Sequence, residues 1–160
     1  MIERTELLDL VPHKGKMLLL SRITSYDLEK WTIHAEFDSD ASCLFYDPLL
    51  GGVPAWVGFE CIAQAVSALS GLAARHAGRR PNIGIILSVA NLEVIRPVIP
   101  PRAFINATEC ARLEAVRVFN GAVYAEDQAG RGLAARARLT VMEVERFQDL
   151  LPKGGVHGTN

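Results

Sequence analysis

One stretch of the chain, from Val57 to Arg75, is apolar around most of the circumference of a helix. Pro54 suits its first turn, and Gly78 with Pro81 ends it. A helix that is apolar nearly all round belongs in the interior of a domain, so the pattern predicts one long buried helix. Its apolar positions are Val57, Phe59, Ile62, Ala63, Ala65, Val66, Ala68, Leu69, Leu72 and Ala73.

Before this helix, the pattern predicts a short helix, a hairpin and a loop. Three leucines beside acidic residues indicate a helix over 3–10 that stops before Pro12. Residues 17–26 and 31–37 read as strands joined by a turn at 27–30, and the second strand alternates clearly. Residues 38–55, rich in Asp, Pro and Gly, form a long irregular loop, a feature that is often functional.

After the helix, the chain is strand-like over 83–95, 102–114, 116–126 and 132–146. Asn120-Gly121 could be a two-residue hairpin turn, but a turn at Asp127–Gly130 leaves two strands of similar length and is preferred. The order predicts an α+β domain in which one antiparallel sheet wraps around one helix. We expect a single domain over 1–150 and a flexible Gly-rich tail over 151–160.

Composition narrows the function classes. The chain has 160 residues, 49% of them hydrophobic, and a formal net charge of −1, which argues against a general nucleic-acid or membrane-surface binder. Polar residues such as Glu60 and Glu93 break the apolar stretches, and no signal peptide or membrane span is predicted. No metal site or cofactor is predicted either. The three cysteines lack paired spacing and read as buried inert thiols in a reducing cytoplasm: Cys43, Cys61 and Cys110.

Glu60 is the most informative residue, because it lies on the most apolar helix. Gln64, Ser67 and Gly71 follow on the same face and complete a polar stripe. A buried carboxylate needs a partner or a proton. Glu60 is therefore either part of a structural network with backbone or arginine, or a general acid or base. The N–H groups at the start of the helix could hold a thioester carbonyl.

Three segments together resemble motifs of the 3-hydroxyacyl-ACP dehydratases of the FabZ/FabA type. They are residues 12–22 (PHKGKMLLLSR), 53–64 (VPAWVGFECIAQ) and 95–100 (IRPVIP), in the order of that family. The resemblance implies the hotdog fold, in which a sheet wraps a long central helix, and a dimer. Residues 54–64 and 83–87 (IGIIL) further resemble the ApeP-type hotdog proteins of aryl-polyene lipid pathways, which lack the usual catalytic His.

The resemblance also implies a site. Glu60 matches the family's acid, which protonates the departing hydroxyl, while the position of the family's base, a His, is occupied by Tyr46. Tyrosine is a poor base at neutral pH; the adjacent Asp47 could act instead, or could only cap the turn before Pro48. The candidate catalytic residues are thus Glu60, Tyr46 and Asp47, and the candidate substrate-binding residues are Pro54, Ala55, Trp56 and Gln64.

The remaining histidines do not replace the missing base. His13 matches a family position that is structural, and His76 at the helix C-terminus suits a capping role. His34 and His157 are expected to be structural or exposed.

Three functions remain open. The chain is a 3-hydroxyacyl-ACP dehydratase-like protein with Glu60 as acid, a hotdog thioesterase that uses Glu60, or a non-catalytic partner of a second hotdog subunit. The expected partners are an acyl carrier protein or CoA thioester and a hotdog subunit, in a homodimer or heterodimer. A basic rim that docks an acidic carrier is also possible, although an ordinary solvated helix end explains the same residues: Arg75, Arg79, Arg80, Arg96 and Arg102.

Overall fold

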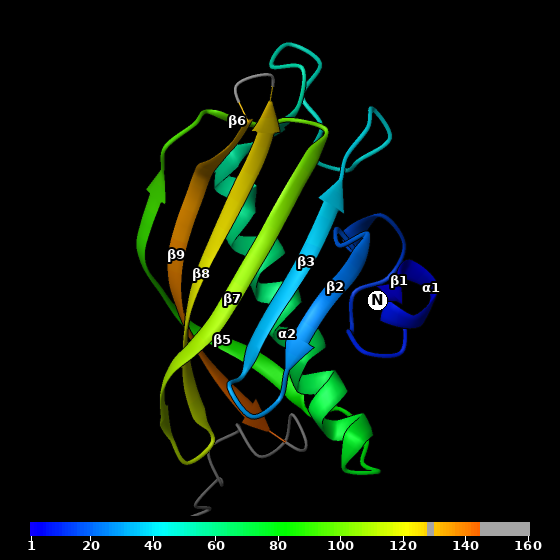
Figure 1. Cartoon of the computed structure of the whole chain (residues 1–160), viewed down its shortest axis with the longest axis vertical. Helices are drawn as coiled ribbons and strands as arrows, with labels where there is room; N and C mark the ends of the chain where they lie inside the picture. Colours follow the sequence, from blue (N-terminus) through cyan, green and yellow to red (C-terminus); the bar gives the residue numbers. More distant parts are fainter. Residues whose placement is uncertain (128–129, 145–160) are drawn as a thin grey trace, which may run out of the picture.

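The structure, a computed structural model, describes residues 1–127 and 130–144 (Figure 1). Two single-turn 3₁₀ helices, Gly15–Met17 and Ala55–Val57, precede β2 and α2. The predicted tail over 151–160 lies outside the described residues. The elements are β1 (Ile2–Glu3), α1 (Arg4–Leu7), β2 (Arg22–Asp27), β3 (Thr32–Asp38), β4 (Val53–Pro54), α2 (Gly58–His76), β5 (Ile83–Val94), β6 (Val98–Ile99), β7 (Arg102–Leu113), β8 (Val116–Asp127) and β9 (Gly130–Val144).

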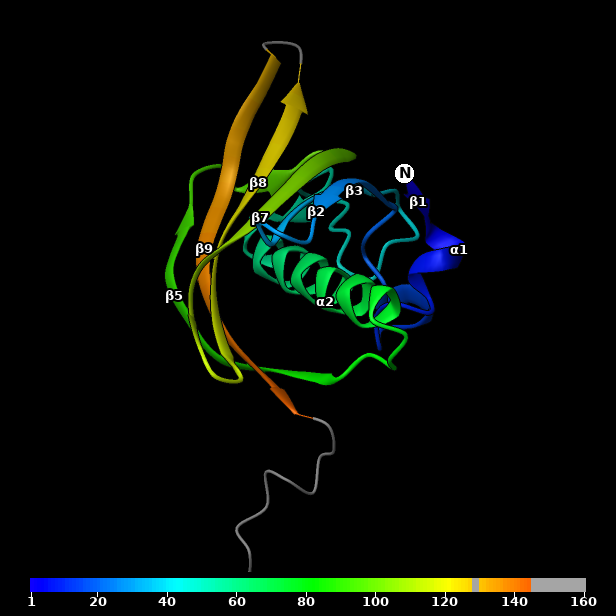
Figure 2. The same cartoon turned by 60° about the horizontal axis from the view of Figure 1, so that its bottom comes forward.

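A single seven-stranded antiparallel sheet, in the order β1-β2-β3-β7-β8-β9-β5, curves around α2. Figure 2 shows α2 lying in the hollow of this sheet. Along β3, Ile33, Ala35 and Phe37 are buried against the helix, and the side chains between them point to the other face. The α+β layout predicted from the sequence is therefore confirmed.

Two glycines allow α2 to approach its neighbours closely. A Cβ on Gly121 of β8 would lie 2.2 Å from Cγ2 of Ile62, and a Cβ on Gly71 would lie 2.3 Å from the carbonyl oxygen of Leu10. Only glycine fits at such distances. The first contact sets the helix against the sheet, and the second sets it against the N-terminal segment.

Most predicted elements are confirmed within a few residues. The long buried helix is α2, and Gly78, with φ +65°, follows it as predicted. β8 and β9 are paired up to Asp127 and Gly130, where the preferred turn was placed. The alternative turn is wrong, because Asn120 and Gly121 lie inside β8 and pair with Arg138 and Ala137.

The predicted strand over 17–26 is wrong in its first half. β2 begins only at Arg22, although Leu18, Leu19 and Leu20 are all buried. Side chains take the place of a neighbouring strand: Gln64 accepts from the N–H of Leu19, and Arg4 donates to the carbonyls of Leu18 and Leu20. An apolar run can thus be buried without a ladder when side chains satisfy its backbone.

The N-terminal helix is also shorter than predicted. It spans only Arg4–Leu7, because the first residues pair with β2 as the short strand β1, which the sequence pattern did not indicate.

The stretch Ala55–His76 is long and apolar enough to cross a membrane by length and composition, with a mean hydropathy of 1.4. In the structure 67% of the 18-residue window that has this hydropathy is buried inside the protein. Its apolar surface is therefore explained by packing within the sheet.

Candidate active site

Glu60 lies in the first turn of α2, on the side that faces the segment before β2. Its side chain is 21% exposed. The Nε2 amide of Gln64 donates to Glu60 Oε1 at 2.9 Å, and Nε2 of His13 lies 3.3 Å from the same oxygen. Among the described residues, no hydrogen bond is made to Oε2. The two carboxylate oxygens therefore differ, because Oε1 is contacted by Gln64 and His13 and Oε2 by no hydrogen bond from the described residues.

Gln64 is fully buried and uses its whole amide within the protein. Its Oε1 accepts from Leu19 N at 2.8 Å, and its Nε2 donates to Met17 O at 2.8 Å and to Glu60. Gln64 thus ties Glu60 to the segment that covers this end of α2. Its role as a substrate contact stays a prediction, since these bonds occupy both amide hydrogens.

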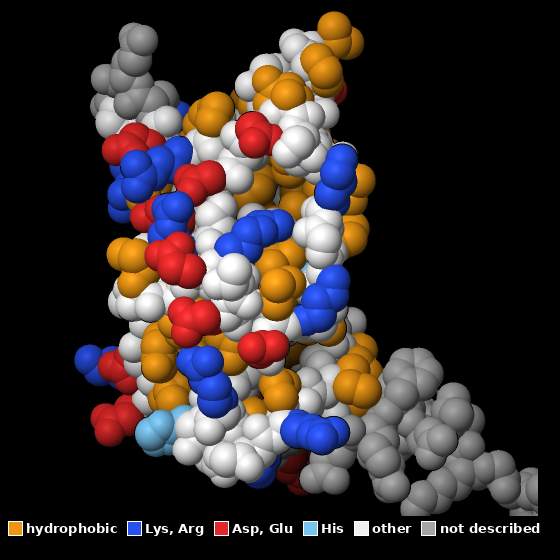
Figure 3. Space-filling view, turned by 90° about the vertical axis from the view of Figure 1, so that its right-hand side faces the viewer, with side chains coloured by type: hydrophobic (Ala, Val, Ile, Leu, Met, Phe, Trp, Pro, Cys, Tyr) orange, Lys and Arg blue, Asp and Glu red, His pale blue; other side chains and the backbone are white. Residues whose placement is uncertain are grey.

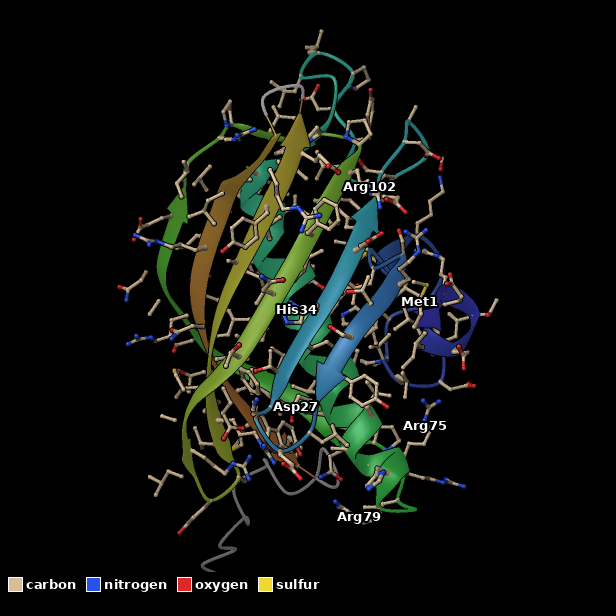
Figure 4. All side chains as sticks on the ribbon, viewed as in Figure 1. Met1, Asp27, His34, Arg75, Arg79 and Arg102 are labelled. Carbon is tan, nitrogen blue, oxygen red and sulfur yellow. The ribbon has the colours of Figure 1, made fainter. Side chains whose placement is uncertain are left out.

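His13 is the site residue that the sequence analysis did not assign. Its motif was visible in the sequence, but the match pointed to a structural role. No periodicity could show that the 12–20 segment crosses the polar stripe of α2. His34 sits instead on the outer face of the sheet, where its Nδ1 lies 2.8 Å from Oδ1 of Asn106 (Figure 4).

Asp47 and Tyr46 lie in the long loop before α2. Asp47 Oδ1 accepts from the N–H groups of Leu49 at 2.8 Å and Leu50 at 3.4 Å, and its backbone pairs with Gly52. This is the capping role that the sequence left open. Neither residue makes a hydrogen bond or ion pair with Glu60, and their role as a base stays a prediction.

The predicted substrate-binding residues before α2 differ in access. Ala55 is fully buried and its N–H is bonded to Pro97 O, whereas Trp56 is 51% exposed and meets the ring of Phe45 edge-on. Pro54 belongs to β4, which pairs with β6. Trp56 is therefore the most exposed member of this set, and Pro54 is half-buried.

The three cysteines are not alike. Burial, and then the charges of Glu60 and Cys43, raise the pKa of the Cys61 thiol, which is inert as expected. Cys110 is exposed, contrary to the prediction, because it alternates with the buried positions Ala103, Ile105 and Ala107 and so lies on the outer face of β7. Among the described residues, no group of three His, Cys, Asp or Glu side chains could hold a metal ion.

The predicted arginine rim is not one surface. Arg75 and Arg79 lie at the C-terminal end of α2, whereas Arg102 lies at the opposite end of the sheet (Figure 4). Arg102 also donates to Glu36 at 3.5 Å and lies over the ring of Phe104. One chain therefore does not bring Arg102 together with Arg75 and Arg79, and docking of an acidic carrier at the helix end stays a prediction.

Two cavities are present elsewhere. One of about 480 Å³ lies on the outer face of the sheet and is lined by polar side chains such as Asn106, Asn120 and Arg138. The other, of about 500 Å³, is lined by Leu18, Leu19 and residues around Asp38 and Cys43. Glu60 lines neither of these two cavities.

Comparison with known proteins decides the family. The model of the ApeP-like family, described as ApeP dehydratase, matches residues 5–152. The chain belongs to the ApeP-like dehydratase family. A 3-hydroxyacyl-[acyl-carrier-protein] dehydratase FabZ of Chlamydia caviae is 28% identical to this ApeP-like protein over 91% of its chain and 94% of the relative.

Solved structures confirm the hotdog fold of this ApeP-like protein. The dehydratase heterocomplex ApeI:P from Xenorhabdus doucetiae superposes with a TM-score of 0.76 at 17% identity, over 88% of this chain and 91% of the other. A thioesterase family protein from Silicibacter pomeroyi has a TM-score of 0.61 at 12% identity, over 78% and 85%. At such identities the likeness concerns the fold alone.

Proposed function

We propose that this ApeP-like protein takes part in the dehydration of 3-hydroxyacyl chains on acyl carrier protein, in fatty-acid or aryl-polyene lipid biosynthesis, with Glu60 as the general acid. The observation that carries the proposal is the carboxylate itself. Glu60 Oε1 is held by Gln64 and approached by His13, while Oε2 has no hydrogen bond from the described residues. The family match and the FabZ relative support the reaction class.

In the reaction, a base takes the proton from the carbon next to the thioester carbonyl, and the C–O bond at the third carbon breaks. Glu60 gives its proton to the departing hydroxyl, which leaves as water, and a carbon–carbon double bond remains. The acid must keep its geometry while charge moves, which suits a carboxyl group held by a buried amide.

The base comes from a second hotdog subunit. In this chain the expected His is Tyr46, and the carboxylate of the neighbouring Asp47 accepts two backbone N–H groups of its own loop. The heterocomplex described for the ApeI:P structure supports a mixed pair.

The outermost strand β5 offers the surface for such a pair. It is hydrogen-bonded to β9 on one side, and among the described strands none pairs with its other side. An exposed aliphatic edge strand of this length aggregates unless it is covered or paired. Six aliphatic side chains of β5, together with the residue that follows, are each 39–52% exposed: Ile83, Ile86, Leu87, Val89, Leu92, Val94 and Ile95.

The decisive experiment follows enoyl product from 3-hydroxyacyl-ACP, with this protein alone and with the hotdog subunit that co-purifies with it. We expect product only from the pair, and a loss of at least about 10²-fold with Glu60→Gln, the size expected when a general acid is removed. Enoyl product from the protein alone, lost with Tyr46→Phe, would instead place the base in this chain. Release of free thiol from acyl-CoA, with no enoyl product, would favour the thioesterase alternative.

The surface is tested separately. Ile86→Lys together with Val89→Lys should separate the pair in light scattering after gel filtration, because both side chains lie on the β5 edge strand. Leu113→Lys, at the end of β7, is the matched control, since Leu113 is 75% exposed and lies on another strand. A cytoplasmic location belongs to the same proposal, consistent with three free cysteines.

A further inference from the structure

His13 is a titratable side chain at the site to which the proposed reaction gives no role. It lies within 3.3 Å of Glu60 Oε1, the oxygen that also accepts from Gln64. Its side chain is 29% exposed and that of Glu60 is 21% exposed, so both groups of the contact are partly open to solvent.

The other ring nitrogen indicates how the proton is placed. His13 Nδ1 is buried and has no hydrogen-bond partner. A buried N–H without an acceptor costs more than a bare acceptor nitrogen without a donor. The hydrogen is therefore favoured on Nε2, the nitrogen that lies 3.3 Å from Glu60 Oε1.

The backbone around His13 is fixed by two cationic side chains. Lys14 Nζ donates to the carbonyls of Val11, at 3.0 Å, and Leu8. Arg4 donates to Gly15 O at 3.2 Å and to Leu18 O at 2.6 Å. A histidine on a segment held at both sides keeps its ring in one place, as a positioning group must.

We propose that His13 is a positioning residue for Glu60. His13 donates a hydrogen bond from Nε2–H to Glu60 Oε1, so that Oε2 is the oxygen that carries and delivers the proton. As the proton leaves Oε2, negative charge grows on the carboxylate, and the donors of His13 and Gln64 at Oε1 stabilise it. This inference rests on the proposed role of Glu60 as the general acid.

Kinetics of the active pair on 3-hydroxyacyl-ACP test the inference. His13→Ala should lower kcat by about 10–100-fold with little change in KM, because a misplaced acid slows the chemical step. His13→Gln, whose amide nitrogen can take the place of Nε2, should restore most of the rate. His34→Ala is the matched control, since His34 lies on the outer face of the sheet, and it should keep the wild-type kcat.

A second arm separates the inference from the proposed function. If His13 acts through Glu60, His13→Ala slows the wild-type pair but adds nothing to Glu60→Gln. An active pair that loses its rate with Glu60→Gln but not with His13→Ala would overturn only the inference. Further slowing by His13→Ala in the Glu60→Gln background would overturn it as well, by giving His13 a role of its own.

A third arm needs no activity. In the ¹⁵N NMR spectrum of the histidine-labelled protein alone, His13 should carry a hydrogen on Nε2 and none on Nδ1, and its Nε2 signal should shift in Glu60→Gln. A hydrogen on Nδ1, or no response to Glu60→Gln, contradicts the contact even if the pair proves inactive. Thermal unfolding of each variant shows whether it is folded.

Discussion

Glu60 and Asp47 are the two carboxylates of the candidate site, and their hydrogen bonds come from different distances along the chain. Glu60 contacts His13 directly, and Gln64, four residues along the same helix, links it to Met17 and Leu19. One remote segment, residues 13–19, therefore converges on Glu60. Asp47 is bonded by Leu49 and Leu50, two and three residues further on.

The two carboxylates therefore differ in how far their positions depend on the folded domain. A side chain held by a remote segment keeps its place only when the whole domain is folded, whereas a cap needs only its own loop. The loop of Asp47 also carries exposed apolar side chains, among them Leu44, Leu49 and Leu50, and Leu49 is 96% exposed. Figure 3 shows apolar side chains gathered at this upper end of the molecule.

Gln64→Leu should have the largest effect, because Gln64 links Glu60 to residues 17–19. It leaves Met17 O and Leu19 N without partners in the interior, and each such group costs about 1–3 kcal/mol. We expect a loss of about 3 kcal/mol in the free energy of unfolding, measured by urea denaturation. Ser67→Ala, on the same face of α2, is the control and should cost much less. Equal stability of both variants would mean that water satisfies the 17–19 backbone.

Gly71→Ala tests a second contact between α2 and the N-terminal segment, at Leu10. The added Cβ would lie 2.3 Å from Leu10 O, a backbone atom that moves only with its segment. We expect a loss of about 1–3 kcal/mol in unfolding free energy, as for other overpacked sites. Gly84→Ala on β5, where a Cβ would meet nothing within 4 Å, should be close to neutral. A Gly71→Ala protein as stable as wild type would show that the N-terminal segment is not tightly docked.

Gly51→Ala is the corresponding change in the Asp47 loop. Gly51 has φ +66° and no atom within 4 Å of an added Cβ, so the cost comes from the backbone alone. We expect a loss of about 1–2 kcal/mol in unfolding free energy, with the loop kept in place. Gly84→Ala again serves as the control. A loss as large as that of Gln64→Leu would mean that the loop of Asp47 depends on the core as strongly as the contact of Gln64 with residues 17–19 does.

These expectations also show what the sequence could predict. The helix 57–75 and the strands after it follow from local periodicity, which needs no knowledge of tertiary contacts. Glu60 was found because a charge on such an apolar helix demands an explanation. The burial of Leu18–Leu20 without a strand, and the contact of His13 with Glu60, depend on where a remote segment crosses α2. That crossing is fixed by Gln64, Arg4 and Gly71 acting across the fold, and no local pattern records it.

Asp47→Asn should have the smallest effect, and it distinguishes a cap from a catalytic base at this position. Asparagine keeps the side-chain oxygen that accepts from Leu49 and Leu50 but removes the charge, so the cap survives and a catalytic base does not. If Asp47 is only a cap, kcat on 3-hydroxyacyl-ACP should stay within about 3-fold of wild type. The unfolding free energy should stay within about 0.5 kcal/mol of wild type. Asp47→Ala is the matched variant, which removes the cap and should cost about 0.5–2 kcal/mol of stability. A loss of kcat in Asp47→Asn at unchanged stability would instead make Asp47 the base, and the two carboxylates would then be the two halves of one site.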